Sequence, residues 1–357
     1  AKAQRVLGAA TGLTALRHGS HSAYPFFSEQ GQGAYLALLA LALWSGRRHF
    51  ARAWRIAWGR ATADGIAPMR YRSAFLGLGA ALLALAVWSH CSGLTAPFGL
   101  AFFLLYFVYC MALTRLVAEG GIVWPLGPLG PQHIITSVLG TRSVPPRVLT
   151  IAALQWQHVR EYRALLMPAV LQGLRIRSAV NSRERTWPAA YYAALMTAIV
   201  VSLPLALRLL YPDGSLLARG SAAWAFKGFG REPFVRLQRA LANPVGPDGY
   251  ALAAMAAGAA MTLLLGALRF RFVWWPLHPL GYVFSGTMQR WLYTHSWLSI
   301  ATGWLLKVTM LRYGGPRLTR RAQPFFIGLV VGDLLSAGLW TLIHGLTGHL
   351  GQPIWAI

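Results

Sequence analysis

The chain has little charge, and very little negative charge. Of its 357 residues only 12% are charged, and 9 Asp and Glu stand against 33 Lys and Arg, which gives a formal net charge of +24. Soluble domains carry about 25% charged residues. With 56% hydrophobic residues and a mean hydropathy of +0.46, this scarcity excludes an ordinary water-soluble domain.

Cysteine is scarce too, and the common catalytic motifs are absent from the sequence. Cys91 and Cys110 lack a metal-binding spacing, so we expect neither a disulfide framework nor a metal site. Walker loops, G-x-S-x-G and H-E-x-x-H motifs do not occur. The sequence therefore gives no support for an enzyme and leaves any cofactor unknown.

The many arginines lie in short blocks between long apolar stretches. Such blocks are typical of the cytoplasmic loops of membrane proteins, whereas nucleic-acid binding would favour basic residues with interleaved aromatics on a soluble domain. We therefore predict an all-α integral protein of the bacterial inner (cytoplasmic) membrane. Its basic loops are expected in the cytoplasm, and no nucleic-acid partner is expected.

About eight transmembrane helices are predicted, since each needs roughly 20 mostly apolar residues. The candidates are residues 34–45, two spans within 73–114, and residues 186–207, 249–268, 272–289, 291–306 and 324–346. Pro97, close to the polar turn at Ser92 and Gly93, divides the second span from the third. Residues 272–289 are the weakest candidate, and we expect a broken helix there because Pro276 and Pro279 interrupt it.

The connecting segments complete the predicted organisation. They comprise an N-terminal segment (1–33), a three-span unit (34–118), a Gly/Pro-rich re-entrant or interfacial region with a basic cytoplasmic loop (119–185), the fourth span (186–207), an interfacial loop (208–248), a four-span unit (249–346) and a tail (347–357). Amphipathic helices that lie on the membrane surface are expected in the two long connections.

Arg115 and Glu119 form the most informative pair of ionisable residues. They are four residues apart at the end of the third span, which places them on one helix face within ion-pair reach. One interpretation is an interfacial ion pair that closes the helix. The other is a substrate or ion site at a helix break, with residues 120–131 as re-entrant backbone, because many secondary transporters build their sites from broken helices.

Asp333 and Lys307 are the ionisable residues of the last two spans, where a charge costs on the order of 3 kcal/mol or more. Asp333 could bond to an Arg or Trp of a neighbouring helix, or it could couple an ion or a proton to transport. Lys307 could extend to the cytoplasmic surface or could meet Asp333.

Four histidines lie in or near the predicted spans: His90, His278, His295 and His344. Each is a possible cofactor ligand or proton-relay group. A single histidine on an apolar helix is more often a hydrogen-bonded packing residue, and no haem-attachment motif is present. These positions remain secondary candidates.

Several segments together resemble one family. They are residues 29–31 (EQG) and 33–35 (GAY), and at the other end residues 304–307 (WLLK), 311–315 (LRYGG) and 324–333 (PFFIGLVVGD). This pattern resembles an uncharacterised bacterial family of multi-pass membrane proteins, a domain of unknown function. The resemblance implies that the chain corresponds to the C-terminal half of longer members. The last pattern is also faintly similar to the oligopeptide-transporter superfamily.

Two main hypotheses for the function follow. The first is a permease-like protein that moves a small solute, in which Arg115 and Glu119 bind or gate and Asp333 couples an ion. The alternative is a non-catalytic scaffold or accessory subunit of a respiratory or photosynthetic complex that binds lipid or pigment. The expected partners are membrane lipids, and possibly other membrane subunits or further copies of the chain. An enzyme acting on lipid-linked substrates is the least favoured interpretation.

Overall fold

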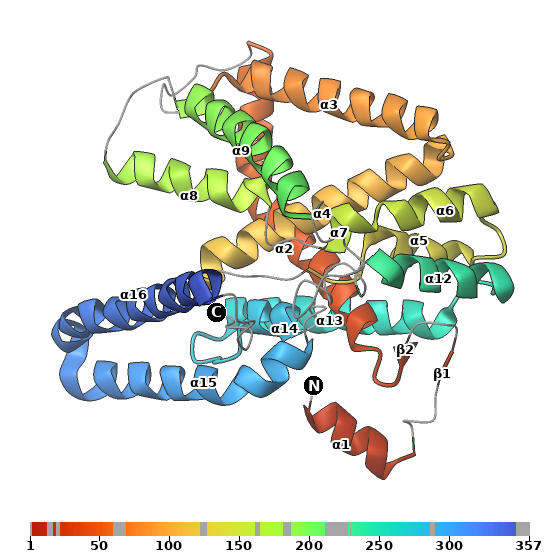
Figure 1. The fold of residues 1–357 in the computed structure, drawn as a ribbon. Coiled ribbons are helices and arrows are strands. Elements are labelled where there is room, and N and C mark those ends of the chain that lie inside the picture. The colour runs from red at the N-terminus through yellow and green to blue at the C-terminus, as the bar shows by residue number, and fades with distance from the viewer. Residues whose placement is uncertain are drawn as a thin grey trace. The chain divides into compact units, whose positions relative to one another are not determined.

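The fold is almost entirely helical. The computed structural model describes residues 2–12, 17–18, 22–59, 69–121, 127–160, 165–180, 187–210, 228, 230–285 and 290–347. The elements, shown in Figure 1, are α1 (Lys2–Ala10), β1 (Arg17–His18), β2 (Ser22–Ala23), α2 (Phe27–Ala57), α3 (Tyr71–Ser92), α4 (Ala96–Gly120), α5 (Pro131–Leu139), α6 (Pro146–Leu154), α7 (Trp156–Arg160), α8 (Leu166–Ala179), α9 (Trp187–Leu210), α12 (Gly230–Ala242), α13 (Gly249–Arg271), α14 (Pro279–Ser285), α15 (Arg290–Thr309), η4 (Met310–Gly314) and α16 (Gly315–Thr347). The two short strands form one antiparallel pair.

The chain divides into two compact units. The first comprises Ala1–Leu209 and Arg231–Met288, and the second comprises Leu210–Gly230 and Gln289–Ile357. Within the first unit, α12, α13 and α14 belong with the N-terminal helices.

The core of the first unit lies where α2, α4 and α13 pack against the short helices α5, α6, α7 and α14. Large side chains from α2 and α4 fill its centre: Tyr35, Phe102, Tyr109, Leu113 and Leu116 are each less than 2% exposed. The rings of Tyr35 and Tyr109 meet edge to face, with their centroids 6.1 Å apart. Edge-to-face pairs of this kind hold neighbouring helices in register.

The packing of α2 on α13 depends on glycine. A methyl group added at Gly33 would overlap the backbone of Met255, and one added at Gly258 would overlap the backbone of Gln30. The two helices therefore touch backbone to backbone. Close approach through small residues is common in membrane helix pairs, because lipid offers no hydrophobic driving force and contact must come from tight packing.

Four helical segments are long and apolar enough to cross a membrane: Tyr71–Ser92, Ala96–Gly120, Gly249–Arg271 and Leu298–Ile343. The predicted helical membrane protein is thus supported, while the count of eight spans is not confirmed. The predicted division near Pro97 is confirmed, since α3 ends at Ser92 and α4 begins at Ala96. In α9 the described apolar stretch, Ala189–Leu205, is shorter.

Residues 272–289 do not form a membrane-spanning helix in the described part of the chain. Residues 272–278 are non-helical, and α14 has 7 residues. At 1.5 Å per residue such a helix is about 10 Å long, against a hydrocarbon core of about 30 Å. The prolines at 276 and 279 explain the interruption, because proline cannot donate the backbone hydrogen bond that a helix interior requires.

In the second unit, α15 and α16 form the two arms of a hairpin, drawn in blue in Figure 1. The π-helical turn η4 and Gly315, whose φ is 64°, join the arms. The left-handed φ favours glycine at this position. None of the apolar window in Leu298–Ile343 is buried within the protein, so both arms present apolar surface outward. Such surface is expected to contact lipid or another protein.

Candidate functional site

A large pocket lies in the first unit where the middle of α2 and the C-terminal parts of α4 and α13 meet the beginning of α14. Its volume is about 880 Å³. Its polar lining consists of Ser45, Arg47, Arg115, Glu119, Arg269 and His278, and its apolar lining consists of Leu38, Leu41, Trp44, Leu263, Gly266, Ala267, Phe270 and Pro279. Three of the predicted site residues, Arg115, Glu119 and His278, are thus brought together.

The ion pair predicted from the spacing of Arg115 and Glu119 is present. Nε of Arg115 donates to Oε1 of Glu119 over 2.8 Å, and the side chains are 30% and 43% exposed. Immediately after this pair α4 ends at Gly120, and Gly121 follows with a φ of 64°. The ion pair therefore lies at the end of the helix, facing the pocket.

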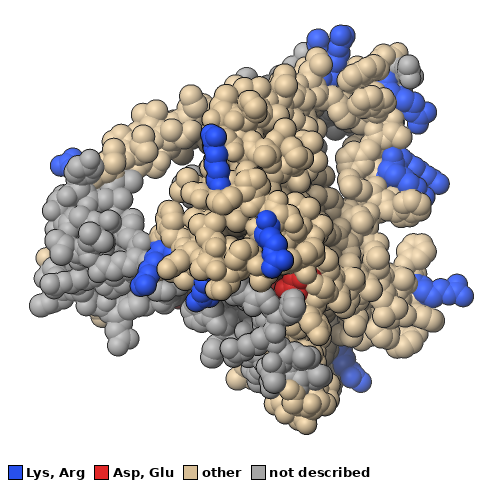
Figure 2. All heavy atoms as spheres, turned by 90° about the vertical axis from the view of Figure 1, so that its right-hand side faces the viewer, with Lys and Arg blue, Asp and Glu red and all other residues tan. Residues whose placement is uncertain are grey.

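The pocket carries an excess of positive charge. Three guanidinium groups line it, from Arg47, Arg115 and Arg269 on three different helices, whereas Glu119 is the only carboxylate among its lining residues. Arg47 stacks on the ring of Trp44 at 4.4 Å and donates to the carbonyl oxygen of the same residue. On the face drawn in Figure 2, basic side chains stand out singly and acidic atoms are scarce. The pocket is therefore suited to a small anion.

His278 is held at the wall of this pocket, outside the four candidate membrane-crossing helices. Its Nδ1 accepts a hydrogen bond from the backbone N–H of Leu280 over 3.1 Å. Burial lowers the pKa of His278, the nearby guanidinium groups of Arg269 and Arg115 lower it further, and Glu119 opposes them. The imidazole is therefore neutral near pH 7.

A second polar cluster is buried where α2 meets α5. It consists of Glu29, Gln32 and His133, which are 1%, 0% and 7% exposed. Nδ1 of His133 lies 3.1 Å from Oε1 of Gln32, and Nε2 of His133 lies 3.6 Å from Oε1 of Glu29. Nearby, the hydroxyl of Tyr282 donates to Oε1 of Gln30 over 2.9 Å.

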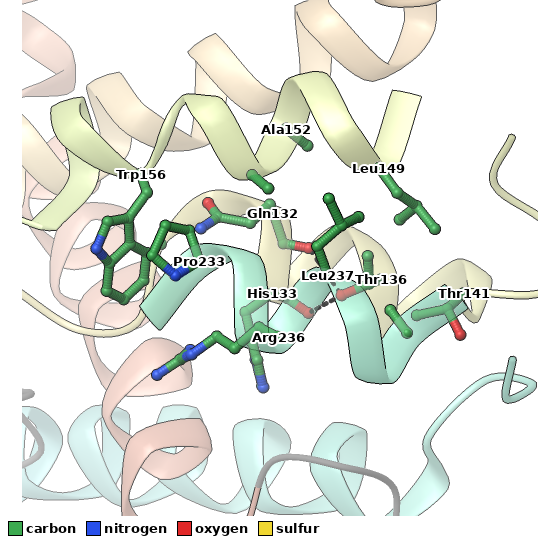
Figure 3. Close-up of a pocket in the computed structure, with 13 residues that line it drawn as sticks. Gln132, His133, Thr136, Thr141, Leu149, Ala152, Trp156, Pro233, Arg236 and Leu237 are labelled. Atoms are coloured by element: carbon green, nitrogen blue, oxygen red, sulfur yellow. Dashed lines mark hydrogen bonds between the residues drawn. The ribbon is translucent and has the colours of Figure 1, made fainter. Parts of the chain in front are cut away.

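His133 also lines a small pocket of about 80 Å³ between α5, α6 and α12 (Figure 3). Trp156 and Pro233 stand at one end of this pocket and Thr141 at the other. Arg236 lies 4.9 Å from the ring centroid of Trp156 and pairs with Glu232 one turn away on α12. His133 thus belongs both to the buried polar cluster and to the residues around this pocket.

The remaining predicted residues lie away from these pockets. Asp333 and Lys307 are exposed on α16 and α15, and within the described residues no ion pair joins them. His90 is exposed near the end of α3. The side chains of His295 and His344 lie outside the described residues. Where side chains are described, no three His, Cys, Asp or Glu lie together as a metal site would require.

The expected re-entrant backbone at 120–131 is only partly described. Residues 122–126 lie outside the described residues, and α5 begins at Pro131 after a non-helical approach. The carbonyl oxygens of Leu129 and Gly130 in this approach accept hydrogen bonds from Nε2 of Gln32. Leu129 and Gly130, in the approach to α5, thus contact the buried polar cluster.

Sequence reasoning missed Arg47, Arg269, Glu29, Gln32 and His133 as site residues. For Glu29 a signal was present, since it is one of only 9 acidic residues and stands at the start of an apolar stretch. The two arginines were assigned to basic loops, because nothing in the local sequence tells that they meet Arg115. Their meeting is a consequence of helix packing.

The comparisons with known proteins give a family and no function. No curated protein and no solved structure matches the chain. One family model matches residues 1–356. The match supports the resemblance to an uncharacterised family. The chain therefore belongs to the family of unknown function DUF6785.

Proposed function

We propose that this protein is a permease-like carrier of a small anion, and that the pocket lined by Arg47, Arg115 and Arg269 is its solute site. One observation carries the proposal: three guanidinium groups from three helices line one pocket with a single carboxylate. Guanidinium groups bind carboxylate, phosphate and sulfate through paired, charge-assisted hydrogen bonds. Two of the three charges are not matched by an acidic lining residue, which favours a dianion.

Glu119 acts as the internal counter-ion in this proposal. With its Oε1 2.8 Å from Nε of Arg115, it neutralises that guanidinium while no solute is bound. An arriving anion competes with Glu119 for Arg115, and this competition changes the contact at the end of α4. The break at Gly121 supports such a role, because many secondary transporters bind their solutes at helix ends.

The location in a bacterial inner membrane, with the arginine-rich ends in the cytoplasm, belongs to the same proposal. The middle of α2 and the C-terminal parts of α4 and α13 contribute to one pocket. The positive-inside rule assigns the arginine-rich residues that follow the apolar part of each helix to one side, the cytoplasm. We further propose that α2, α9, α15 and α16 cross the membrane in addition to α3, α4 and α13.

Uptake by the purified chain in proteoliposomes tests the proposal, with radiolabelled sulfate, phosphate and succinate as probes and glucose as the neutral control. We expect uptake of at least one dianion and none of glucose. Arg115→Gln and Arg269→Gln should reduce anion uptake at least tenfold, whereas Arg48→Gln and Arg271→Gln, matched losses of charge on α2 and α13 outside the pocket lining, should retain it.

A binding measurement on the same protein in detergent separates binding from transport. A ligand present at 100 times its Kd stabilises the folded state by about 2.7 kcal/mol. Sulfate or succinate should therefore raise the melting temperature of the wild type and of Arg48→Gln, and raise it little in Arg115→Gln. Equal uptake in the wild type and in both pocket variants would refute the assignment of the site.

The scaffold hypothesis remains the second candidate because of one observation. The apolar window of Leu298–Ile343 is wholly unburied within the chain, and that of Tyr71–Ser92 is 6% buried. Surfaces of this kind suit protein partners as well as lipid. A stoichiometric partner or bound pigment after native purification, together with no anion uptake, would favour the scaffold.

A further inference from the structure

The first half of α2 and the start of α5 bury ionisable side chains without an evident structural need. Among the residues whose side chains are described, Glu29 and His133 are the only Asp, Glu, Lys, Arg or His that are buried. Burying such groups is costly unless they are paired or neutral. Their protonation therefore decides whether this part of the core is stable.

Gln32 determines which nitrogen of His133 carries hydrogen. Its amide nitrogen donates to the carbonyl oxygen of Leu129 over 3.1 Å and approaches that of Gly130 at 3.5 Å. A flipped amide would set its oxygen against the same carbonyl groups, so the hydrogen-bond network fixes this orientation. Oε1 of Gln32, 3.1 Å from Nδ1 of His133, can only accept a hydrogen bond, and Nδ1 therefore donates.

The other nitrogen of His133 faces a carboxylate. Nε2 lies 3.6 Å from Oε1 of Glu29. When Nδ1 carries the hydrogen, a neutral imidazole presents a lone pair at Nε2, and an ionised Glu29 presents another. Two acceptors that face each other in a buried site repel. One proton removes the repulsion, either on Nε2, which gives an ion pair, or on Oε1, which gives a neutral hydrogen bond.

Further titratable groups with described side chains lie on the neighbouring elements. These groups are Tyr109 on α4, Arg236 on α12, Asp248 before α13 and Tyr282 on α14. Arg236 pairs with Glu232, the carboxylate of Asp248 accepts from the backbone N–H of Ala251 at the start of α13, and Tyr282 donates to Gln30. Tyr109 lies against Gln32 of the cluster itself. Among the described side chains, Glu29 and His133 are a buried titratable pair close enough to share a proton.

We propose that Glu29 and His133 form a buried proton-binding site, and that its proton is the coupling ion for the solute. The proton enters or leaves Nε2 or Oε1 by exchange with water. Glu29 and Arg47 lie on the same helix, α2, about 27 Å apart along its axis. The coupling rests on the proposed function, whereas the proton site stands on its own geometry.

Solid-state NMR of the whole chain in proteoliposomes, labelled with ¹⁵N-histidine and ¹³C-glutamate, tests the proton site. We expect Nδ1 of His133 to carry hydrogen at pH 7, and one of Nε2 and Oε1 of Glu29 to be protonated. The His133 signal is identified by its loss in His133→Gln, with the exposed His90→Gln as the control. Hydrogen on Nε2 alone, or a neutral imidazole beside an ionised Glu29, would overturn the site.

Proton movement measured with a pH electrode tests the coupling, using sulfate or succinate in lightly buffered proteoliposomes. The wild type should take up protons together with the anion. Glu29→Gln should lose at least 90% of this proton uptake while it retains exchange of labelled anion at equal concentrations on both sides. His90→Gln, a loss of an exposed titratable group on α3, should behave as the wild type.

The outcomes separate the two proposals. Anion uptake without proton movement in the wild type overturns the coupling and leaves the solute site intact. Absence of any anion uptake refutes the proposed function and the coupling with it, and the NMR measurement still decides the proton site. Loss of proton uptake in Asp333→Asn but not in Glu29→Gln would assign the coupling to Asp333 and overturn its assignment to Glu29.

Discussion

At the scale of single residues, His278 is a sensitive reporter of the proposed anion pocket. Its pKa is lowered by burial and by the guanidinium groups of Arg269 and Arg115. We predict that Arg269→Gln raises this pKa, because it removes a positive charge that disfavours the imidazolium ion. An anion bound in the pocket should raise it as well. The ¹⁵N signals of His278, followed by pH titration with and without sulfate, measure both effects.

Arg271→Gln is the matched control for this titration, because Arg271 lies on the same helix but does not line the pocket. A pKa of His278 that is the same with and without saturating sulfate would contradict anion binding beside it.

The lowered pKa of His278 also determines how this residue affects the stability of the fold as the pH changes. Since the folded pKa lies below the ordinary 6.5, the unfolded chain binds the proton more readily, and His278 weakens folding as the pH falls below 6.5.

The sequence predicts those features of the site that depend on neighbours along one helix. The pair of Arg115 and Glu119 follows from the four-residue spacing, and it is present. Arg47 and Arg269 are 68 and 154 residues from Arg115 along the chain, by their numbers in the sequence, and local patterns contain no information about such distances. Only the packing of α2, α4 and α13 brings the three guanidinium groups to one pocket.

At the scale of the helices, the same distinction holds. The break between α3 and α4 was predictable because proline, glycine and serine act locally on the backbone. The contact of α2 with α13 was not, since neither the polar stretch 29–33 (EQGQG) around Gly33 nor the apolar stretch around Gly258 tells which helix the glycine meets. Glycine at a close helix contact and glycine on an exposed helix face have the same local sequence signal, and only the partner helix distinguishes them.

The close contact of α2 with α13 at Gly258 gives a testable prediction. Gly258→Val places a side chain where the backbone of Gln30 lies, so the helices must separate. We expect a loss of stability of at least about 1–3 kcal/mol, the usual range for overpacking. The melting temperature of the purified protein in detergent should fall, or the protein should fail to accumulate in the membrane.

Gly79→Ala on α3 is the matched control. An added methyl group at Gly79 meets nothing within 4 Å. Alanine is favoured over glycine inside a helix by about 1 kcal/mol, so this variant should be as stable as the wild type or slightly more stable. If Gly258→Val melted at the same temperature as Gly79→Ala, the described contact between α2 and α13 would be wrong.

At the scale of the whole chain, the first unit constrains how the polypeptide crosses the membrane. Phe26 and Tyr250 stack with their ring centroids 6.3 Å apart at the starts of α2 and α13, and Arg47 and Arg269 line one pocket toward their ends, so the two helices run in the same direction. The end of α4 lines that pocket as well. If α2, α4 and α13 cross in one direction, the chain must return once between α2 and α4 and once between α4 and α13.

Helix α3 provides the first return, and α9 is the long apolar helix described between α4 and α13. This requirement supports a crossing by α9 that its apolar length of 17 residues alone does not establish. The stretches of sequence that follow residues 45, 114 and 268 are all rich in arginine. This is the pattern expected if α2, α4 and α13 run in one direction and their C-terminal ends lie in the cytoplasm.

The two native cysteines make this topology testable. Cys91 is exposed near the C-terminal end of α3, and Cys110 is buried within α4. Because α3 is the return between α2 and α4 in the proposed topology, we predict that a membrane-impermeant maleimide labels Cys91 from outside intact cells. Arg48→Cys in a Cys91→Ser background should be labelled only after the membrane is permeabilised, since position 48 lies beyond the apolar part of α2 on the arginine-rich side. Labelling of both positions from outside would exclude a crossing by α3, and labelling of position 48 alone would reverse the orientation.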